Sequence, residues 1–168
     1  MPLRFWQRYR EPVQRTPSTS GSGWVVGQMF LLLAVGTVAP WKRGDVSSTW
    51  RLLPALALIA YGTWVGVAGA LALGKNLTPL PEPKAGAHLV TEGVYGRMRH
   101  PLYASMMSLG LGWSLAWGSG LGLVLSVILT AYLHAKAVCE EQLLIDRFPE
   151  YLAYASSVRR YLPFAKRG

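Results

Sequence analysis

Two long runs without a charged residue place the strongest constraint on what this chain can fold into. Residues 22–41 and 52–73 are mostly apolar and contain no Asp, Glu, Lys or Arg. A helix needs about 20 such residues to cross the hydrocarbon core of a bilayer. It also satisfies its own backbone hydrogen bonds, which lipid cannot do. The sequence therefore predicts transmembrane helices over residues 22–41 and 52–73.

Two shorter apolar stretches follow, over residues 102–117 and 121–138. They are separated only by Gly118, Ser119 and Gly120, and glycine allows the tight backbone turns that so short a connection needs. We interpret the pair as a tight helical hairpin. The predicted fold is therefore an all-α integral membrane protein with four transmembrane helices, of which the last two form the hairpin.

The basic residues predict how these helices are oriented. Fourteen of the seventeen Lys and Arg residues precede the first span, lie between the second and third, or end or follow the fourth. Only Lys42, Arg43 and Arg51 lie on the opposite face. By the positive-inside rule the crowded face is cytoplasmic, which predicts cytoplasmic termini and, in a prokaryote, location in the inner (plasma) membrane. The net charge of +9 is then a topology and lipid signal, and no motif supports binding to nucleic acid.

The composition suggests one folded domain preceded by a tail. Residues 1–21 are basic and rich in Pro, Ser and Thr, which predicts a flexible cytoplasmic tail, and residues 22–168 are interpreted as a single membrane domain. No cleavable signal peptide is expected, because the first apolar stretch is too long for one. Cys139 is the only cysteine, so that neither an intrachain disulfide nor a metal site is expected.

Small residues recur every four positions in the second predicted span, at Gly62, Gly66 and Ala70. Such a stripe lets another helix approach closely. Packing within the four-helix bundle is the favoured interpretation, with a monomer as the expected state, and a homodimer interface is the alternative.

The segment HLVTEGVYGRMRHPLY occupies residues 88–103, between the second and third predicted spans. It combines cationic side chains that can donate hydrogen bonds to a carboxylate with tyrosines that offer flat apolar faces and a polar tip. Pro101 biases His100 away from helical conformations, so that the turn into the third span is stiff. A rigid, basic, aromatic corner at the cytoplasmic surface is predicted. The alternative is a basic cluster that only fixes topology and touches anionic lipid.

A further polar cluster, Lys136, Glu140 and Glu141, ends the fourth predicted span. One interpretation is that these side chains mark the water boundary by snorkelling. Adjacent acidic residues contribute little to topology, however, which favours a functional role for the two glutamates. Beyond them, residues 139–164 predict short amphipathic helices on the cytoplasmic membrane face, with Pro149 opening a new helix.

These two blocks resemble the isoprenylcysteine carboxyl methyltransferases and their prokaryotic relatives, integral membrane enzymes that use S-adenosylmethionine. The first block matches the pattern HLVTxGVYxxxRHPxY without a gap, and the C-terminal block is similar to the EExxL segment and tyrosine-rich tail of that family. The resemblance implies methyl transfer from S-adenosylmethionine to a carboxylate, thiol or amine of a hydrophobic or lipid-like acceptor. It also implies that the loop and the C-terminal helices form the cofactor site.

The resemblance further assigns residues to roles. Catalytic roles fall on Glu141 and Lys136, and in the enzymes that act on prenylated proteins an arginine stands at the position of Lys136. The residues matching the cofactor pattern are His88, Leu89, Val90, Gly93, Tyr95, Arg99, His100, Pro101, Tyr103, Glu140 and Glu141.

Two other kinds of protein remain open from the sequence. One is a sterol or isoprenoid reductase-like membrane protein, whose C-terminal part would bind NADPH in the analogous place. The other is a non-catalytic membrane adaptor with the same fold. Binding of S-adenosylmethionine as against NADPH distinguishes the three.

The distribution of basic residues yields a test of topology. Reporter fusions at Gly44 and at Gly168 should report opposite sides of the membrane, with Gly168 on the cytoplasmic side. Reporters on the same side would contradict the four-span prediction.

Overall fold

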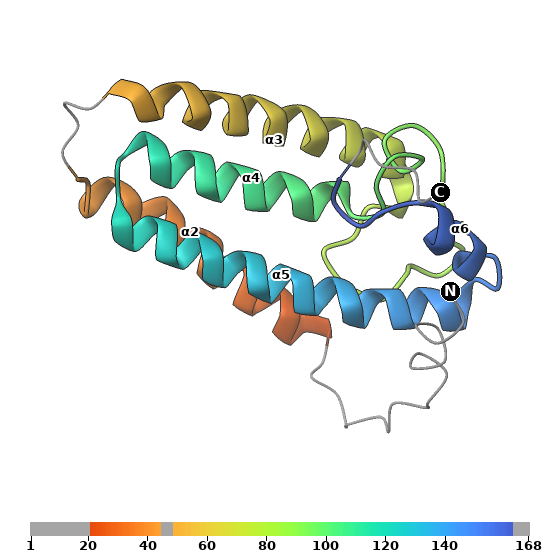
Figure 1. Cartoon of the computed structure of the whole chain (residues 1–168). Coiled ribbons are helices and arrows are strands. Elements are labelled where there is room, and N and C mark those ends of the chain that lie inside the picture. Colours follow the sequence, from red (N-terminus) through yellow and green to blue (C-terminus); the bar gives the residue numbers. More distant parts are fainter. Residues whose placement is uncertain (1–20, 45–48, 163–168) are drawn as a thin grey trace, which may run out of the picture.

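A computed structural model describes residues 21–44 and 49–162 of the chain. Within these residues the secondary structure is helical and contains no strand, apart from one isolated bridge between Met98 and Arg159. The all-α prediction is confirmed for this part of the chain. The helices are α2 (Gly21–Trp41), η1 (Thr49–Arg51), α3 (Leu52–Leu73), η2 (Gly74–Asn76), α4 (Pro101–Ala116), α5 (Gly120–Arg147) and α6 (Tyr151–Ser157) (Figure 1). The predicted tail lies almost entirely outside the described residues.

Three of the described helical stretches are long and apolar enough to cross a membrane: Gly21–Trp41, Thr49–Asn76 and Gly120–Arg147. The prediction of a membrane protein is confirmed at this level. With 16 residues, α4 is shorter than the roughly 20 that a perpendicular crossing needs. A fourth span formed by α4, and with it a transmembrane hairpin of α4 and α5, stays a prediction.

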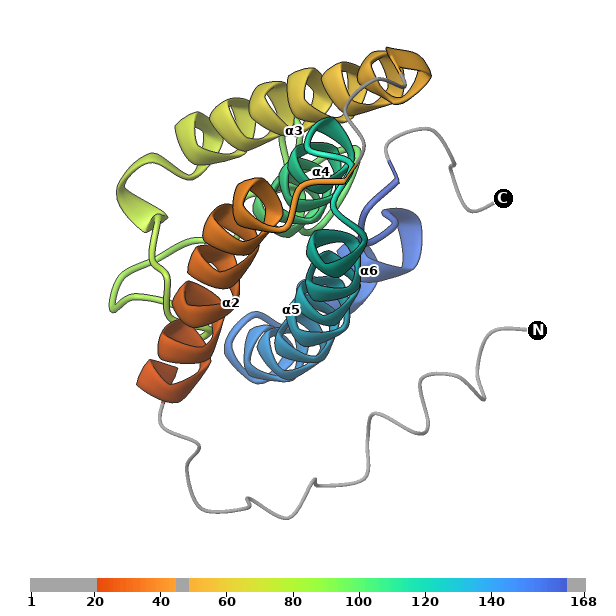
Figure 2. The same cartoon turned by 90° about the vertical axis from the view of Figure 1, so that its left-hand side faces the viewer.

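The helices form a bundle in which α4 packs against α3 and α5, while α2 packs against α5 and α4 (Figures 1 and 2). Two apolar clusters hold it together. One joins α2, α4 and α5 and is centred on Val35, Met107, Leu129 and Leu133. The other joins α3 and α4 to the loop between them through residues that include Val65 and Met98. This loop and α6 lie at one end of the bundle, and the turn from α4 to α5 lies at the other (Figure 1).

A glycine and a capping serine allow the turn between α4 and α5 to be short. Gly118 has a φ of 60°, a left-handed conformation that costs glycine little. The Ser119 hydroxyl then caps α5 by accepting a hydrogen bond from Gly122 N at 3.1 Å. Across the two helices, the Ser114 and Ser126 hydroxyls are hydrogen-bonded at 3.0 Å.

The stripe of small residues on α3 packs against α4 of the same chain. A Cβ atom added at Gly62 would lie 3.0 Å from the carbonyl oxygen of Ser105 in α4, and one added at Gly66 would clash with the hydroxyl of the same serine. On the facing helix, a Cβ at Gly112 would lie 2.9 Å from the carbonyl oxygen of Ala55. Close packing of α3 on α4 therefore accounts for the stripe, and a monomer remains the expected state.

The helix α5 differs from its prediction. The fourth span was expected to end at residue 138, with separate cytoplasmic helices beyond it, but α5 continues unbroken to Arg147. The polar residues at this point are buried: Lys136 is 1% exposed and Glu141 is 3% exposed. The helix ends where Phe148 becomes extended ahead of Pro149, as expected of a residue before proline. Among the described residues, α6 is the one separate C-terminal helix.

The packing of α3 on α4 predicts a stability difference between two matched substitutions. Gly112→Ala should destabilise the protein by about 1 to 3 kcal/mol, because its methyl group would be forced onto the backbone of α3. Gly36→Ala, where a Cβ meets nothing within 4 Å, should be neutral or slightly stabilising, because alanine favours helix. Melting temperatures of the two variants in detergent test this, and equal values would contradict the packing.

Candidate cavity at the loop end of the bundle

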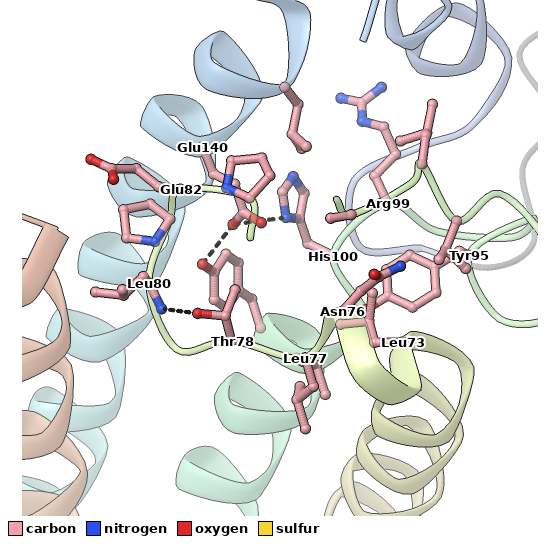
Figure 3. Close-up of a pocket in the computed structure, with 18 of the residues that line it drawn as sticks. Leu73, Asn76, Leu77, Thr78, Leu80, Glu82, Tyr95, Arg99, His100 and Glu140 are labelled. Carbon is pink, nitrogen blue, oxygen red and sulfur yellow. Dashed lines mark hydrogen bonds and ion pairs between the residues drawn. The ribbon is translucent and has the colours of Figure 1, made fainter. Parts of the chain in front are cut away.

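A cavity of about 440 Å³ lies at the end of the bundle that carries the long loop. Its walls come from the ends of α3 and α5, the first turns of α4, the loop segment 76–100, α6 and one residue of α2 (Figure 3). Small-molecule sites in proteins have volumes of about 300 to 1,000 Å³ and combine apolar walls with a few polar groups. By size and lining, this cavity suits an organic ligand of cofactor size.

Most of the residues that the sequence pattern assigned to a cofactor come together here. Eight of the eleven line the cavity, although they come from two blocks of the chain far apart in sequence: His88, Leu89, Val90, Tyr95, Arg99, His100, Tyr103 and Glu140. Lys136 lines it as well. Gly93, Pro101 and Glu141 are not part of the lining.

Gly93 and Pro101 shape the backbone. Gly93 has a φ of 60°, which favours glycine in the turn that precedes Tyr95. Pro101 is the first residue of α4, a position where the missing N–H costs nothing. It also packs against α3, since a Cβ added at Gly69 would lie 3.2 Å from the proline ring.

Glu141 lies behind the cavity wall, where it contacts two guanidinium groups and the imidazole of His100. Its Oε1 accepts hydrogen bonds from Arg99 Nε at 3.1 Å and from Arg160 Nε at 2.9 Å. His100 Nε2 lies 3.0 Å from the same oxygen, and Arg160 Nη2 donates to Oε2 at 2.7 Å. Arg99 in addition donates to the carbonyl oxygens of Ala155 and Val158. The carboxylate therefore fastens the loop to α5 and to the C-terminal segment.

Glu140, the neighbouring residue, faces the cavity. Its Oε2 accepts a hydrogen bond from the Tyr103 hydroxyl at 2.7 Å and lies 3.8 Å from His100 Nδ1 (Figure 3). The His100 and Tyr103 rings are stacked, with centroids 5.4 Å apart. The Glu140 side chain is 26% exposed, compared with 4% for Glu141, so its remaining acceptor capacity is available to a ligand.

Lys136 is held by two partners inside the protein. Its Nζ donates to Gln28 Oε1 of α2 at 2.7 Å and to the carbonyl oxygen of Pro79 at 2.8 Å. The Nζ atom also lies 5.6 Å from the centroid of the Tyr103 ring. The structure therefore does not support the snorkelling interpretation of Lys136. Instead, this lysine joins α2 and the proline-rich segment of the loop to the cavity.

Three tyrosines form an aromatic end of the cavity, namely Tyr95, Tyr151 and Tyr154. The Tyr154 hydroxyl donates to the carbonyl oxygen of Tyr95 at 2.7 Å, and the Tyr151 and Tyr154 rings meet edge to face with centroids 5.7 Å apart. Burial raises the pKa of all three hydroxyls above the usual value. These tyrosines therefore stay protonated and act as hydrogen-bond donors.

Sequence reasoning missed part of the cavity wall. Gln28 of α2 and the loop segment 76–83 contribute to the lining without having been singled out as site residues. For Gln28 a signal existed, because it is the one amide side chain in the apolar run 22–41, and polar groups within spans usually mark a function. The loop segment 76–83 carries no comparable signal, because its position depends on tertiary contacts.

The fold and the cavity together define a class: a helical membrane protein with a polar, aromatic cavity at one end of its bundle. A family model described as phospholipid methyltransferase matches residues 50–150, which is more than half of the chain. The chain belongs to this methyltransferase family. The matched region contains the loop, α4 and α5, and leaves out α2.

A curated relative carries the same indication. Protein-S-isoprenylcysteine O-methyltransferase A of Arabidopsis thaliana is 28% identical to the chain over 113 residues. The similar region covers 65% of this chain and 57% of that relative. The resemblance to isoprenylcysteine methyltransferases noted from the sequence is confirmed at the level of the family.

The environment of Glu141 predicts a large effect of removing its charge. Glu141→Gln should destabilise the protein by about 3 to 5 kcal/mol, because the buried guanidinium of Arg99 and the partly buried one of Arg160 would then face a neutral amide. Thermal unfolding in detergent, without added ligand, measures this loss.

Glu140→Gln is the matched control, because the Tyr103 hydroxyl can still donate to the amide oxygen and the side chain is partly exposed. Its melting temperature should fall much less. Equal losses in the two variants would contradict the structural role given to Glu141.

Proposed function

We propose that this protein is a membrane-embedded, S-adenosylmethionine-dependent methyltransferase that acts on a hydrophobic or lipid-like acceptor. One observation carries the proposal: eight residues of the family-like pattern, drawn from the loop, α4 and α5, line a single cavity of about 440 Å³. Three functional groups of the cavity, an aromatic end, a carboxylate and cationic donors, correspond to parts of that cofactor.

The residues present fit S-adenosylmethionine group by group. Tyr95, Tyr151 and Tyr154 offer flat faces for adenine, and aromatic faces also attract a sulfonium cation. Glu140 offers a carboxylate to the ribose hydroxyls or to the amino group. His88 is the group for the cofactor carboxylate, since it lines the cavity and its ring carries an N–H donor. Arg99 also lines the cavity, but its guanidinium is engaged by Glu141 and by the carbonyl oxygens of Ala155 and Val158. When bound, the cofactor would supply an electrophilic methyl group.

The protein's own contribution would be positioning and exclusion of water. Methyl transfer requires a nucleophile in line with the methyl carbon, and holding two reactants in this geometry can lower a barrier by about 7 to 11 kcal/mol. Lys136 is the cation best placed to orient an acceptor, because it lines the cavity beside Tyr103. Glu141 would act as a positioning residue that holds Arg99 and His100.

Apolar residues of the lining favour an acceptor that arrives from the bilayer. Leu73 of α3, and Leu102 and Met106 of α4, line the same cavity as the polar groups. A long apolar tail would pack on these side chains, with its polar end beside Lys136. The distribution of basic residues favours the cytoplasmic side for the cavity, where S-adenosylmethionine is made.

A binding experiment tests the proposal. The purified protein in detergent should bind S-adenosylhomocysteine in calorimetric titration and should not bind NADPH. Binding of NADPH alone would favour the reductase-like alternative, and binding of neither would favour a non-catalytic adaptor. A labelled methyl donor added to membrane extracts should transfer label to lipid or lipidated material.

Glu140→Gln should weaken S-adenosylhomocysteine binding by about tenfold to more than a hundredfold, because a hydrogen bond to a charged group contributes about 1.5 to 3 kcal/mol. Glu92→Gln is the control, because Glu92 is an exposed residue of the loop between α3 and α4 and lies outside the cavity lining. Unchanged affinity in Glu140→Gln would remove Glu140 from the site.

A further inference from the structure

The hydroxyl of Tyr151 is a buried polar group that the fold itself leaves unpaired. The residue is 2% exposed and lines the cavity. Its hydroxyl has no hydrogen-bond partner within residues 21–44 and 49–162. Because buried polar groups in proteins are nearly always hydrogen-bonded, an exception at a cavity wall calls for an explanation.

Neighbouring tyrosines of the same cavity do not share this property. The Tyr154 hydroxyl donates to the carbonyl oxygen of Tyr95, and the Tyr103 hydroxyl donates to Glu140, both at 2.7 Å. These two hydroxyls are therefore satisfied by the protein. Tyr151 differs from them although it lies on the same helix as Tyr154, in edge-to-face contact with that ring.

The position of Tyr151 is well defined. It is the first residue of α6, and its backbone N–H donates to the carbonyl oxygen of Phe148 at 2.9 Å. The ring is held from the side by Tyr154. Burial keeps its hydroxyl protonated. The protein thus holds a fixed, unpaired hydrogen-bond donor within the wall at the aromatic end of the cavity.

We propose that the Tyr151 hydroxyl hydrogen-bonds directly to bound S-adenosylmethionine, at the adenine. This inference rests on the proposed function and extends it to a residue outside the cofactor pattern read from the sequence. Adenine is the part of the cofactor that combines a flat ring, suited to aromatic walls, with ring nitrogens that accept hydrogen bonds. The donor and the aromatic faces occur together at this end of the cavity.

The experiment compares two variants that each remove one hydroxyl from the same helix. In Tyr151→Phe, affinity for S-adenosylhomocysteine should fall about three- to tenfold, as for loss of one neutral hydrogen bond. The melting temperature without ligand should stay equal or rise, because no internal bond is lost. In Tyr154→Phe the melting temperature without ligand should fall, because the bond to Tyr95 is lost.

The outcomes separate the inference from the proposed function. If the unmodified protein does not bind S-adenosylhomocysteine, the proposed function itself fails. If it binds and Tyr151→Phe binds equally well, the hydroxyl does not contact the ligand and the inference fails while the proposed function stands. A melting temperature that falls in Tyr151→Phe as in Tyr154→Phe would also overturn the inference, because the hydroxyl would then have a partner without ligand.

Displacement of labelled S-adenosylhomocysteine by 5′-methylthioadenosine, which lacks the amino-acid part, tests the adenine assignment. Tyr151→Phe should weaken both compounds by the same factor. Weakening of S-adenosylhomocysteine alone would overturn the assignment to adenine.

Discussion

The buried carboxylate of Glu141 is the interaction on which the loop end of the bundle depends. A charge that is 3% exposed is tolerated only when partners replace its hydration, and here Arg99, Arg160 and His100 do so. The backbone reinforces the same junction, because the N–H groups of Arg99 and His100 donate to the carbonyl oxygens of Arg159 and Arg160. Loop, α5 and C-terminal segment thereby become one rigid unit, and the geometry of the cavity follows from it.

The adjacent residues Glu140 and Glu141 have different structural roles. Successive side chains on a helix point about 100° apart, so when Glu141 faces the arginines, Glu140 faces the cavity. His100 lies between them, with Nε2 beside Glu141 and Nδ1 toward Glu140. The sequence pattern therefore contains residues of two kinds: those that line the cavity, such as Glu140, and those that hold the surrounding structure together, such as Glu141. The structure separates them by burial and by partner.

Much of the fold was predictable because membrane spans are constrained locally. The limits of α2 and α3 agree within a residue with the charge-free runs, since the absence of charge is what lipid demands. The end of α5 ahead of Pro149 follows a local signal. The burial of Lys136 was not predictable from local sequence, because its partner Gln28 lies 108 residues away. For the cavity, the sequence pattern identified eight residues of the lining. It could not identify Gln28 or the loop residue Pro79, whose places depend on contacts between distant segments.

Lys136 also connects α2, the first described helix, to the cavity. Through Gln28 it makes α2 part of the cavity wall, although α2 lies outside the region 50–150 that the family match covers. A protein that kept the matched region and exchanged this helix would retain every residue of the sequence pattern and yet have a different cavity wall. In this architecture, the cavity wall is built from two parts of the chain, and an apolar helix that resembles a simple anchor supplies one of its polar side chains.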